Sequence, residues 1–156
     1  HKLSWDSLVG ASFSSDSGLL RRPISMLTFA LNYYFFGIKP FSFKVVNLVI
    51  HIVNGLGLYV LGRQLLFVYQ KIHRPDLQDK MIQWTALAAS LAWLLHPINL
   101  TAVLYIVQRM TSLASMFSIF GLSFYVWGRW RLWNRQSGLS LMLIGLIGFG
   151  SLSIFS

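Results

Sequence analysis

The sequence has no cysteine and no glutamate among its 156 residues, and it has few charges of any kind. Without cysteine, it offers no disulfide, no thiolate metal ligand and no cysteine nucleophile. Charged residues make up 11% of the chain, whereas a typical soluble domain carries about 25%. These absences exclude an ordinary soluble domain.

Several catalytic and binding motifs are also missing. There is no glycine-rich phosphate loop, no Gly-x-Ser-x-Gly elbow and no pair of histidines at zinc spacing. Asp76 and Asp79 lie beside Arg74 and Lys80, a pattern that indicates solvated surface charges. The residues alone therefore predict no metal site and leave the catalytic residues unknown.

Apolar residues are abundant: they make up 55% of the chain and give a mean hydropathy of +0.60. A membrane span needs about 20 mainly apolar residues, so the length allows about four or five helices. We expect an all-α fold, a polytopic integral membrane helix bundle with short interfacial helices on the external side. The bundle is expected over 42–156, with spans at about 42–66, 82–96, 110–128 and 138–156 and a re-entrant or interfacial helix at 98–108.

The first 41 residues are expected to form an external region with interfacial helices. Residues 1–21 are polar and serine-rich, with apolar residues spaced for one face of a short helix. A second helix is expected to begin at Pro23, because proline suits the first helical position. It is expected to end near Phe36, since Gly37 follows.

The 13 basic residues far outnumber the four acidic ones. They occur in clusters between apolar runs, which is typical of membrane-protein loops and argues against nucleic-acid binding. The loops at 67–81 and 129–137 are rich in Arg and Lys, so the positive-inside rule predicts that both face the cytoplasm. Arg22 and Arg109 then lie on the external side, where an anionic partner such as a phosphate or a lipid headgroup is expected. Interfacial anchoring is the alternative for both, and for Arg109 a distant aspartate, another chain or a cluster of backbone carbonyls also remains open.

Polar residues recur at helical spacing within the apolar segments. The three expected stripes are Lys44–Asn47–His51–Asn54, Thr101–Tyr105–Gln108–Ser112 and Ser25–Thr28–Asn32. At membrane depth such groups face a polar cavity or the bundle interior and often mark function. The alternative is plain hydrogen bonding between helices. His96, before Pro97, is either functional or a structural cap.

Five stretches in order resemble the N-terminal membrane region of type-C glycosyltransferases, in particular the protein O-mannosyltransferase-like group that often carries tetratricopeptide repeats. They are Trp5-Asp6-Ser7-Leu8, Arg22-Pro23-Ile24-Ser25-Met26-Leu27-Thr28-Phe29-Ala30-Leu31-Asn32, Asn47-Leu48-Val49-Ile50-His51-Ile52-Val53-Asn54, Leu95-His96-Pro97 and Tyr105-Ile106-Val107-Gln108-Arg109. The resemblance covers nearly the whole chain, and bacterial members look closest.

The resemblance implies a sugar donor linked to a polyprenyl phosphate, transfer on the outer face of the membrane, and often a divalent metal in the intact enzyme. It also implies that positive and polar side chains hold the donor phosphate, here Arg22, His51, His96, Gln108 and Arg109. The acidic motif of the family falls before His1, so no catalytic role passes to Asp6. We therefore expect a segment truncated at both ends, from a bacterial inner-membrane enzyme.

Two other functions remain open from the sequence. The scarcity of acids and the short chain also fit a non-catalytic integral membrane subunit that packs against other membrane subunits. The polar stripes also fit a transporter or channel, although no acid for ion coupling is found in the apolar segments. Membrane lipids are expected partners in every case.

Overall fold

The computed structural model describes residue 10 and residues 22–156, which are largely α-helical and contain no strand. Its helices are α2 (Pro23–Phe36), α3 (Pro40–His73), α4 (Asp79–Leu94), α5 (Leu100–Leu104), α6 (Arg109–Trp133), α7 (Leu139–Leu143) and α8 (Gly150–Ile154). Short 3-10 turns cover Pro97–Asn99 and Ile106–Gln108, and a π-helical stretch at Ile144–Phe149 joins α7 to α8. The helix expected within residues 1–21 lies outside the described residues.

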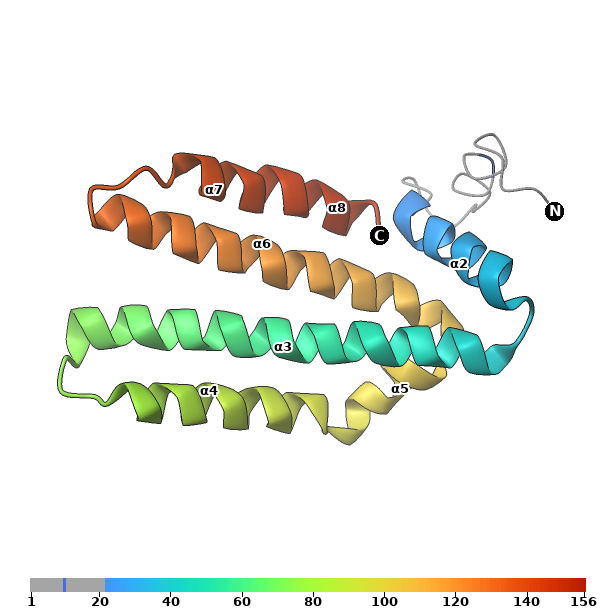
Figure 1. Ribbon diagram of the computed structural model, residues 1–156, viewed down its shortest axis with the longest axis horizontal. Helices are drawn as coiled ribbons and strands as arrows, with labels where there is room; N and C mark the ends of the chain where they lie inside the picture. Colours follow the sequence, from blue (N-terminus) through green and yellow to red (C-terminus); the bar gives the residue numbers. More distant parts are fainter. Residues whose placement is uncertain (1–9, 11–21) are drawn as a thin grey trace.

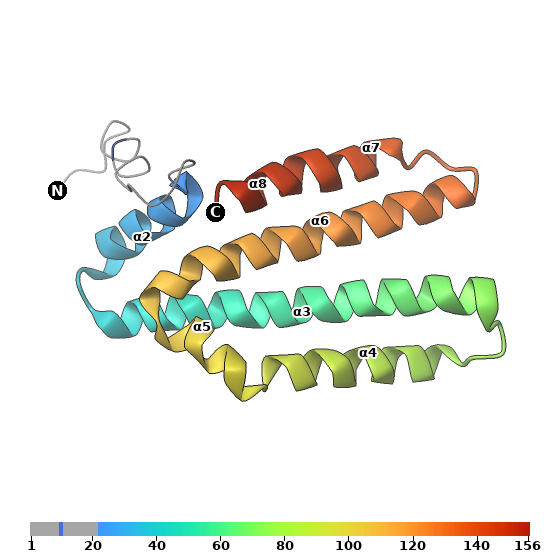
Figure 2. The same ribbon diagram turned by 180° about the vertical axis from the view of Figure 1, so that it is seen from behind.

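The long helices lie side by side in a single layer (Figures 1 and 2). α3 and α6 occupy the middle of the layer and pack against each other, with α4 against the outer side of α3 and the α7–α8 helix against the outer side of α6. α2 crosses one end of the layer, close to the beginnings of α3 and α6. Many large apolar side chains remain exposed on this layer, as expected where lipid or further helices surround it.

The lengths and compositions of the helices confirm a polytopic membrane fold. α3 and the segment Ile106–Trp133 are each long and apolar enough to cross a membrane. α4 together with Pro97–Leu104 also qualifies, but this pair is bent by 53°. α3 has 34 residues, which is about 51 Å at 1.5 Å per residue. It therefore extends well beyond a hydrocarbon core of about 30 Å.

α2 begins and ends where the sequence predicted. Pro23 is its first residue, and Gly37 ends it with a φ of +67°, a left-handed conformation that glycine adopts without strain. Three residues later Pro40 starts α3, so the two helices are joined by a tight turn.

Two expected loops are shorter than predicted. α3 continues through residues 67–73, because no helix breaker occurs before Pro75, which keeps Arg74 out of the helical region. α6 likewise continues to Trp133, so most of the expected 129–137 loop is helical. Both predictions were wrong at these residues: 67–81 was assigned to a loop because it is polar and contains Pro75, and 129–137 because it is rich in Arg and Trp. Such side chains are also compatible with a helix that leaves the membrane.

The expected span at 82–96 ends earlier, at Leu94. His96 has an extended backbone (φ −64°, ψ 129°), because Pro97 follows it. The chain then changes direction and runs through short helical pieces from Pro97 to Gln108. The single helix expected at 98–108 is thus divided into short pieces, and its re-entrant or interfacial placement stays a prediction.

Candidate functional site

A buried arginine connects three helices at the end of the layer where α2 lies. Arg109, the first residue of α6, is 0% exposed. Its Nε donates a hydrogen bond to Asn47 Oδ1 at 2.8 Å. Its Nη2 donates to Asn32 Oδ1 at 2.9 Å and to the Phe43 carbonyl at 3.0 Å, and its Nη1 donates to the Thr28 carbonyl at 3.4 Å. Every guanidinium nitrogen therefore has an acceptor on α2 or α3.

The acceptors around Arg109 are neutral, and aromatic rings cover the rest of its charge. The guanidinium carbon lies 4.6 Å from the centroid of Phe29 and 5.4 Å from that of Phe43. Such contacts are attractive because the ring face carries partial negative charge. A buried charge is tolerated only when it is well hydrogen-bonded, so this arrangement stabilises the junction of α2, α3 and α6.

Asn47 extends the network to the broken segment. It is 0% exposed, and its Nδ2 donates to the carbonyls of Tyr105 at 3.1 Å and Val103 at 3.4 Å. The Asn47 amide thus accepts a hydrogen bond from Arg109 and donates hydrogen bonds to carbonyls at the end of α5. The position of α5 over the layer therefore depends on the same network.

A small polar cavity of about 180 Å³ lies next to this network. α3, the end of α4, the broken segment and the beginning of α6 contribute its walls. The lining residues are His51, Asn54, Trp93, Asn99, Thr101, Ala102, Gln108, Thr111, Ser112 and Ser115. At about 30 Å³ per water molecule, the cavity has room for roughly six waters or a small polar group.

His51 and Asn54 form the α3 wall of the cavity. His51 Nε2 lies 3.0 Å from the Leu94 carbonyl, and since a carbonyl only accepts, Nε2 carries the proton. The imidazole also packs on Trp93, with ring centroids 5.1 Å apart. Asn54 is 2% exposed and donates to the Ser112 carbonyl at 2.9 Å, but its buried Oδ1 has no partner among the described residues.

The prediction that the three polar stripes are buried is only partly confirmed. Asn47, His51 and Asn54 are buried, as predicted, but Lys44, in the second turn of α3, is exposed. Ser25 and Asn32 are also buried.

The second stripe is only partly correct: Ser112 is buried and Gln108 is half-buried, while Thr101 and Tyr105 are exposed. The backbone leaves the helix at Tyr105 (φ −89°, ψ 121°). These four residues therefore never lie on one continuous helical face, and helical spacing does not apply to them.

The structure brings together part of the predicted donor-phosphate set. His51 and Gln108 line the same cavity, and Arg109 follows Gln108 in the chain. Arg22 is exposed, and its Nη1 lies 3.6 Å from the sulfur of Met110, the residue after Arg109. His96 is exposed and accepts the Ile98 amide at Nδ1, 3.3 Å away, which is a capping geometry.

Several residues that line the polar cavity were not predicted from the sequence. Thr111 and Ser115 lie three and seven residues after Gln108, on the same face of the α6 segment, and Thr111 Oγ1 lies 3.2 Å from Gln108 Oε1. This spacing was visible in the sequence. Trp93 and Asn99 carried no such signal, because the bend at Pro97 determines their position.

The two described carboxylates lie at the other end of the layer. Asp76 forms an exposed ion pair with Arg74 at 3.0 Å, and the hydrogen bond from Arg74 lowers the pKa of the Asp76 carboxyl. Asp79 Oδ1 accepts from Gln70 Nε2 at 3.0 Å. Asp76 and Asp79 thus have local surface partners, consistent with the expectation from the sequence.

The described residues do not fit a divalent metal. Mg²⁺ and Ca²⁺ favour carboxylate oxygens, and the polar cavity offers neutral amides, hydroxyls and one imidazole. No group of three or more His, Cys, Asp or Glu side chains is found within residues 22–156. We therefore assign no chemistry at this cavity to a metal.

Comparison with known proteins relates the chain to one kind of enzyme. It is 31% identical over 116 residues to protein O-mannosyl-transferase F38B6.6 of Caenorhabditis elegans, which covers 74% of this chain and 15% of that protein. It is also 31% identical over 96 residues to protein O-mannosyl-transferase TMTC3 of Homo sapiens and to that of Mus musculus, covering 62% of this chain and 9% of either relative.

No family model and no solved structure matches the chain. The chain spans less than a sixth of the length of the curated relatives it matches. Over most of its own length, it is similar to a short segment of protein O-mannosyl-transferases.

Proposed function

We propose that this chain is part of a membrane glycosyltransferase that moves a sugar from a polyprenyl-phosphate donor to an acceptor on the external face. The observation that carries the proposal is the polar cavity lined by both His51 and Gln108, in a chain similar to protein O-mannosyl-transferases. In a membrane helix bundle, such a cavity provides polar contacts that lipid cannot.

The proposed role of the cavity is to bind the sugar-phosphate part of the donor. When the sugar leaves, negative charge grows on the phosphate, and fixed donors stabilise it. Gln108 offers an amide and Arg22 offers an exposed guanidinium on the α2 side. His51 donates its Nε2 proton to the Leu94 carbonyl, so its Nδ1 is an acceptor and can bind a hydroxyl group of the sugar but not a phosphate oxygen. His96 is included because it is exposed beside the same broken segment.

Arg109 has a different proposed role. All three of its nitrogens already donate to protein oxygens, so we assign it to positioning α2 and α6 and to adding positive potential behind the cavity. The described residues offer no carboxylate at this end, and we assign no catalytic base to them.

Sugar transfer by the full-length protein in membrane vesicles tests the proposal. Gln108→Ala should lower the transfer rate about tenfold, because a hydrogen bond to a charged group contributes about 1.5–3 kcal/mol. Gln136→Ala is the matched control, since Gln136 is an exposed amide in the turn after α6. If both variants transfer sugar at the wild-type rate, the cavity does not bind the donor.

A non-catalytic membrane subunit is the second candidate. The fully internal network of Arg109 favours it, because that network needs no ligand to satisfy its charge. The two candidates differ in one result: a subunit of this kind would show neither transfer nor donor binding in the wild-type protein.

A further inference from the structure

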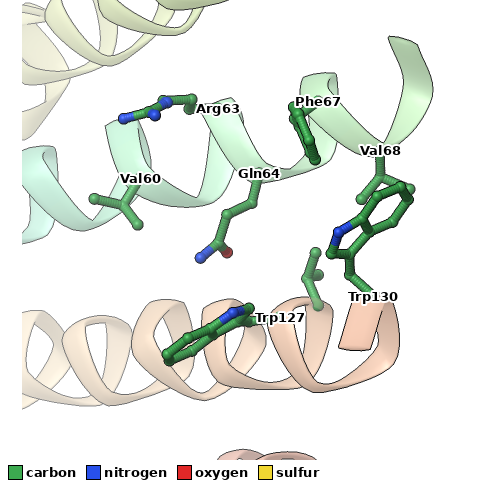
Figure 3. Close-up of a pocket in the computed structure, with 8 residues that line it drawn as sticks. Val60, Arg63, Gln64, Phe67, Val68, Trp127 and Trp130 are labelled. Carbon is green, nitrogen blue, oxygen red and sulfur yellow. The ribbon is translucent and has the colours of Figure 1, made fainter. Parts of the chain in front are cut away.

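A second hollow lies between α3 and α6, toward the ends of these helices that are remote from α2. Its volume is about 470 Å³, within the range of ligand pockets. Figure 3 shows that it opens between the two helices, with Gln64 extending from α3 toward Trp127 on α6. We call it the α3–α6 groove; its main lining residues are Val60, Arg63, Gln64, Phe67, Trp127 and Trp130.

The surface of the groove is apolar and aromatic, with a polar group that lacks a partner. Phe67 and Trp130 meet edge to face with ring centroids 5.3 Å apart. Gln64 Oε1 is buried without a hydrogen-bond partner among the described residues. A buried amide left unpaired is costly. Because Gln64 lines the groove, turning its amide toward a polar atom of an occupant would remove that cost.

The surroundings of the groove are strongly basic. Arg63 lies at its edge and is exposed, and the Lys71 ammonium lies 5.3 Å from the Phe67 ring centroid. The same end of the layer carries Arg63, Lys71, Arg74, Lys80, Arg129, Arg131 and Arg135 against two aspartates. Within residues 22–156 the sole ion pair is Arg74–Asp76, so Arg63 has no acidic partner there.

We propose that the α3–α6 groove binds one anionic phospholipid. An acyl chain lies along the apolar and aromatic wall, where its burial contributes free energy in proportion to the area removed from solvent. The lipid phosphate accepts hydrogen bonds from the planar guanidinium of Arg63. The amide of Gln64 pairs with the glycerol or headgroup region.

The shape and charge of the groove favour a lipid over a protein helix. A helix with its side chains is about 10–12 Å wide, so it would cover the groove without entering it, and it would leave Gln64 unpaired. Basic sites between membrane helices are known to attract anionic headgroups, and Trp side chains favour the headgroup level. This inference does not depend on the proposed transfer activity.

Lipid binding to the full-length protein purified in detergent tests the proposal, with dioleoyl phosphatidylglycerol and dioleoyl phosphatidylcholine as probes. Native mass spectrometry should show one phosphatidylglycerol bound more tightly than phosphatidylcholine. Arg63→Gln should weaken phosphatidylglycerol binding about fivefold, the effect of one basic residue near an anionic surface, and weaken phosphatidylcholine binding less, because the choline cation offsets the charge of the phosphate that both lipids carry. Val126→Phe should weaken both, because Val126 lines the groove and the larger ring occupies it.

Lys80→Gln is the matched control, since Lys80 is an exposed basic residue of the same end that does not line the groove. It should retain wild-type affinity for phosphatidylglycerol. Equal binding of the two lipids by the wild-type protein would overturn the proposal, as would an equal loss in Lys80→Gln and Arg63→Gln. If the wild-type protein binds neither lipid, another part of the protein covers the groove and the proposal is wrong. Size-exclusion profiles should confirm that each variant is folded.

Discussion

Arg109 shows how a single buried charge can organise the end of a membrane helix layer. Its hydrogen bonds run to Asn32 on α2 and to Asn47 on α3, and Asn47 in turn holds the Tyr105 carbonyl. The sequence predicted that Arg109 needs a partner, because the nearest acid in the chain is Asp79. Backbone carbonyls were among the partners that the sequence left open, but the amides of Asn32 and Asn47 were not predicted, since those contacts depend on how α2 crosses the layer.

We predict that Arg109→Ala destabilises the protein by about 2–5 kcal/mol, because it leaves several buried acceptors without donors. In the cycle formed with Asn47→Ala, the double variant should lose less than the sum of the single losses, by at least about 1 kcal/mol. Unfolding in detergent with increasing denaturant measures these differences. Arg129→Ala, on an exposed site of the same helix, should change stability by less than about 0.5 kcal/mol. Strict additivity of Arg109→Ala and Asn47→Ala would contradict the network.

At the level of elements, glycines set how closely α6 and the α7–α8 helix approach. A Cβ on Gly145 would lie 2.5 Å from the Gly121 carbonyl oxygen, and a Cβ on Gly121 would lie 2.8 Å from the Gly145 carbonyl oxygen. Small residues allow such close backbone contact, which is a common basis of helix association in membranes. The π-helical stretch at Ile144–Phe149 occupies the same contact.

We predict that Gly145→Leu separates α6 from the α7–α8 helix and lowers stability by about 1–3 kcal/mol, the usual cost of overpacking. Gly148→Ala is the control, because the nearest atom to its added Cβ is 3.9 Å away. Thermal unfolding of the two variants in detergent provides the comparison. An unchanged melting temperature for Gly145→Leu would show that this contact is not close in the folded protein.

The helices themselves could largely be predicted from the sequence, whereas their ends and the site could not. Pro23 and Gly37 specify α2 through local backbone chemistry, so its bounds were correct. Residues 67–73 were assigned to the loop that contains Pro75 because the segment 67–81 is polar, although no helix breaker occurs before Pro75. His51 and Gln108 line the same cavity although they are 57 positions apart in the chain, and the bend at Pro97 that lies between them could not be predicted in detail from the sequence.

For the whole molecule, the single layer places the turns after α3 and after α6 at the same end (Figures 1 and 2). The polar cavity and Arg109 lie toward the opposite end. We predict from the distribution of basic residues that the turns at 74–78 and 134–138 face the cytoplasm. The donor site would then face the external side, in agreement with the proposed function.

Single cysteines test this topology, because these 156 residues contain no cysteine, and the unsubstituted protein gives the background labelling. Gln78→Cys and Ser137→Cys should resist a membrane-impermeant thiol reagent in intact cells and react after the membrane is opened. Both positions are exposed, so a lack of reaction in intact cells reports the side of the membrane. Ready labelling of both cysteines in intact cells would reverse the predicted orientation.

The most direct test of the central claim is photo-crosslinking of the full-length protein with a polyprenyl-phosphate sugar that carries a photoreactive group near the phosphate. If the polar cavity binds the donor, the crosslinks should map by mass spectrometry to peptides containing His51 and Gln108–Ser115. An excess of unmodified donor should suppress them. Crosslinks confined to other peptides, or crosslinks at the cavity that excess donor does not suppress, would contradict the assignment of this cavity as the donor site.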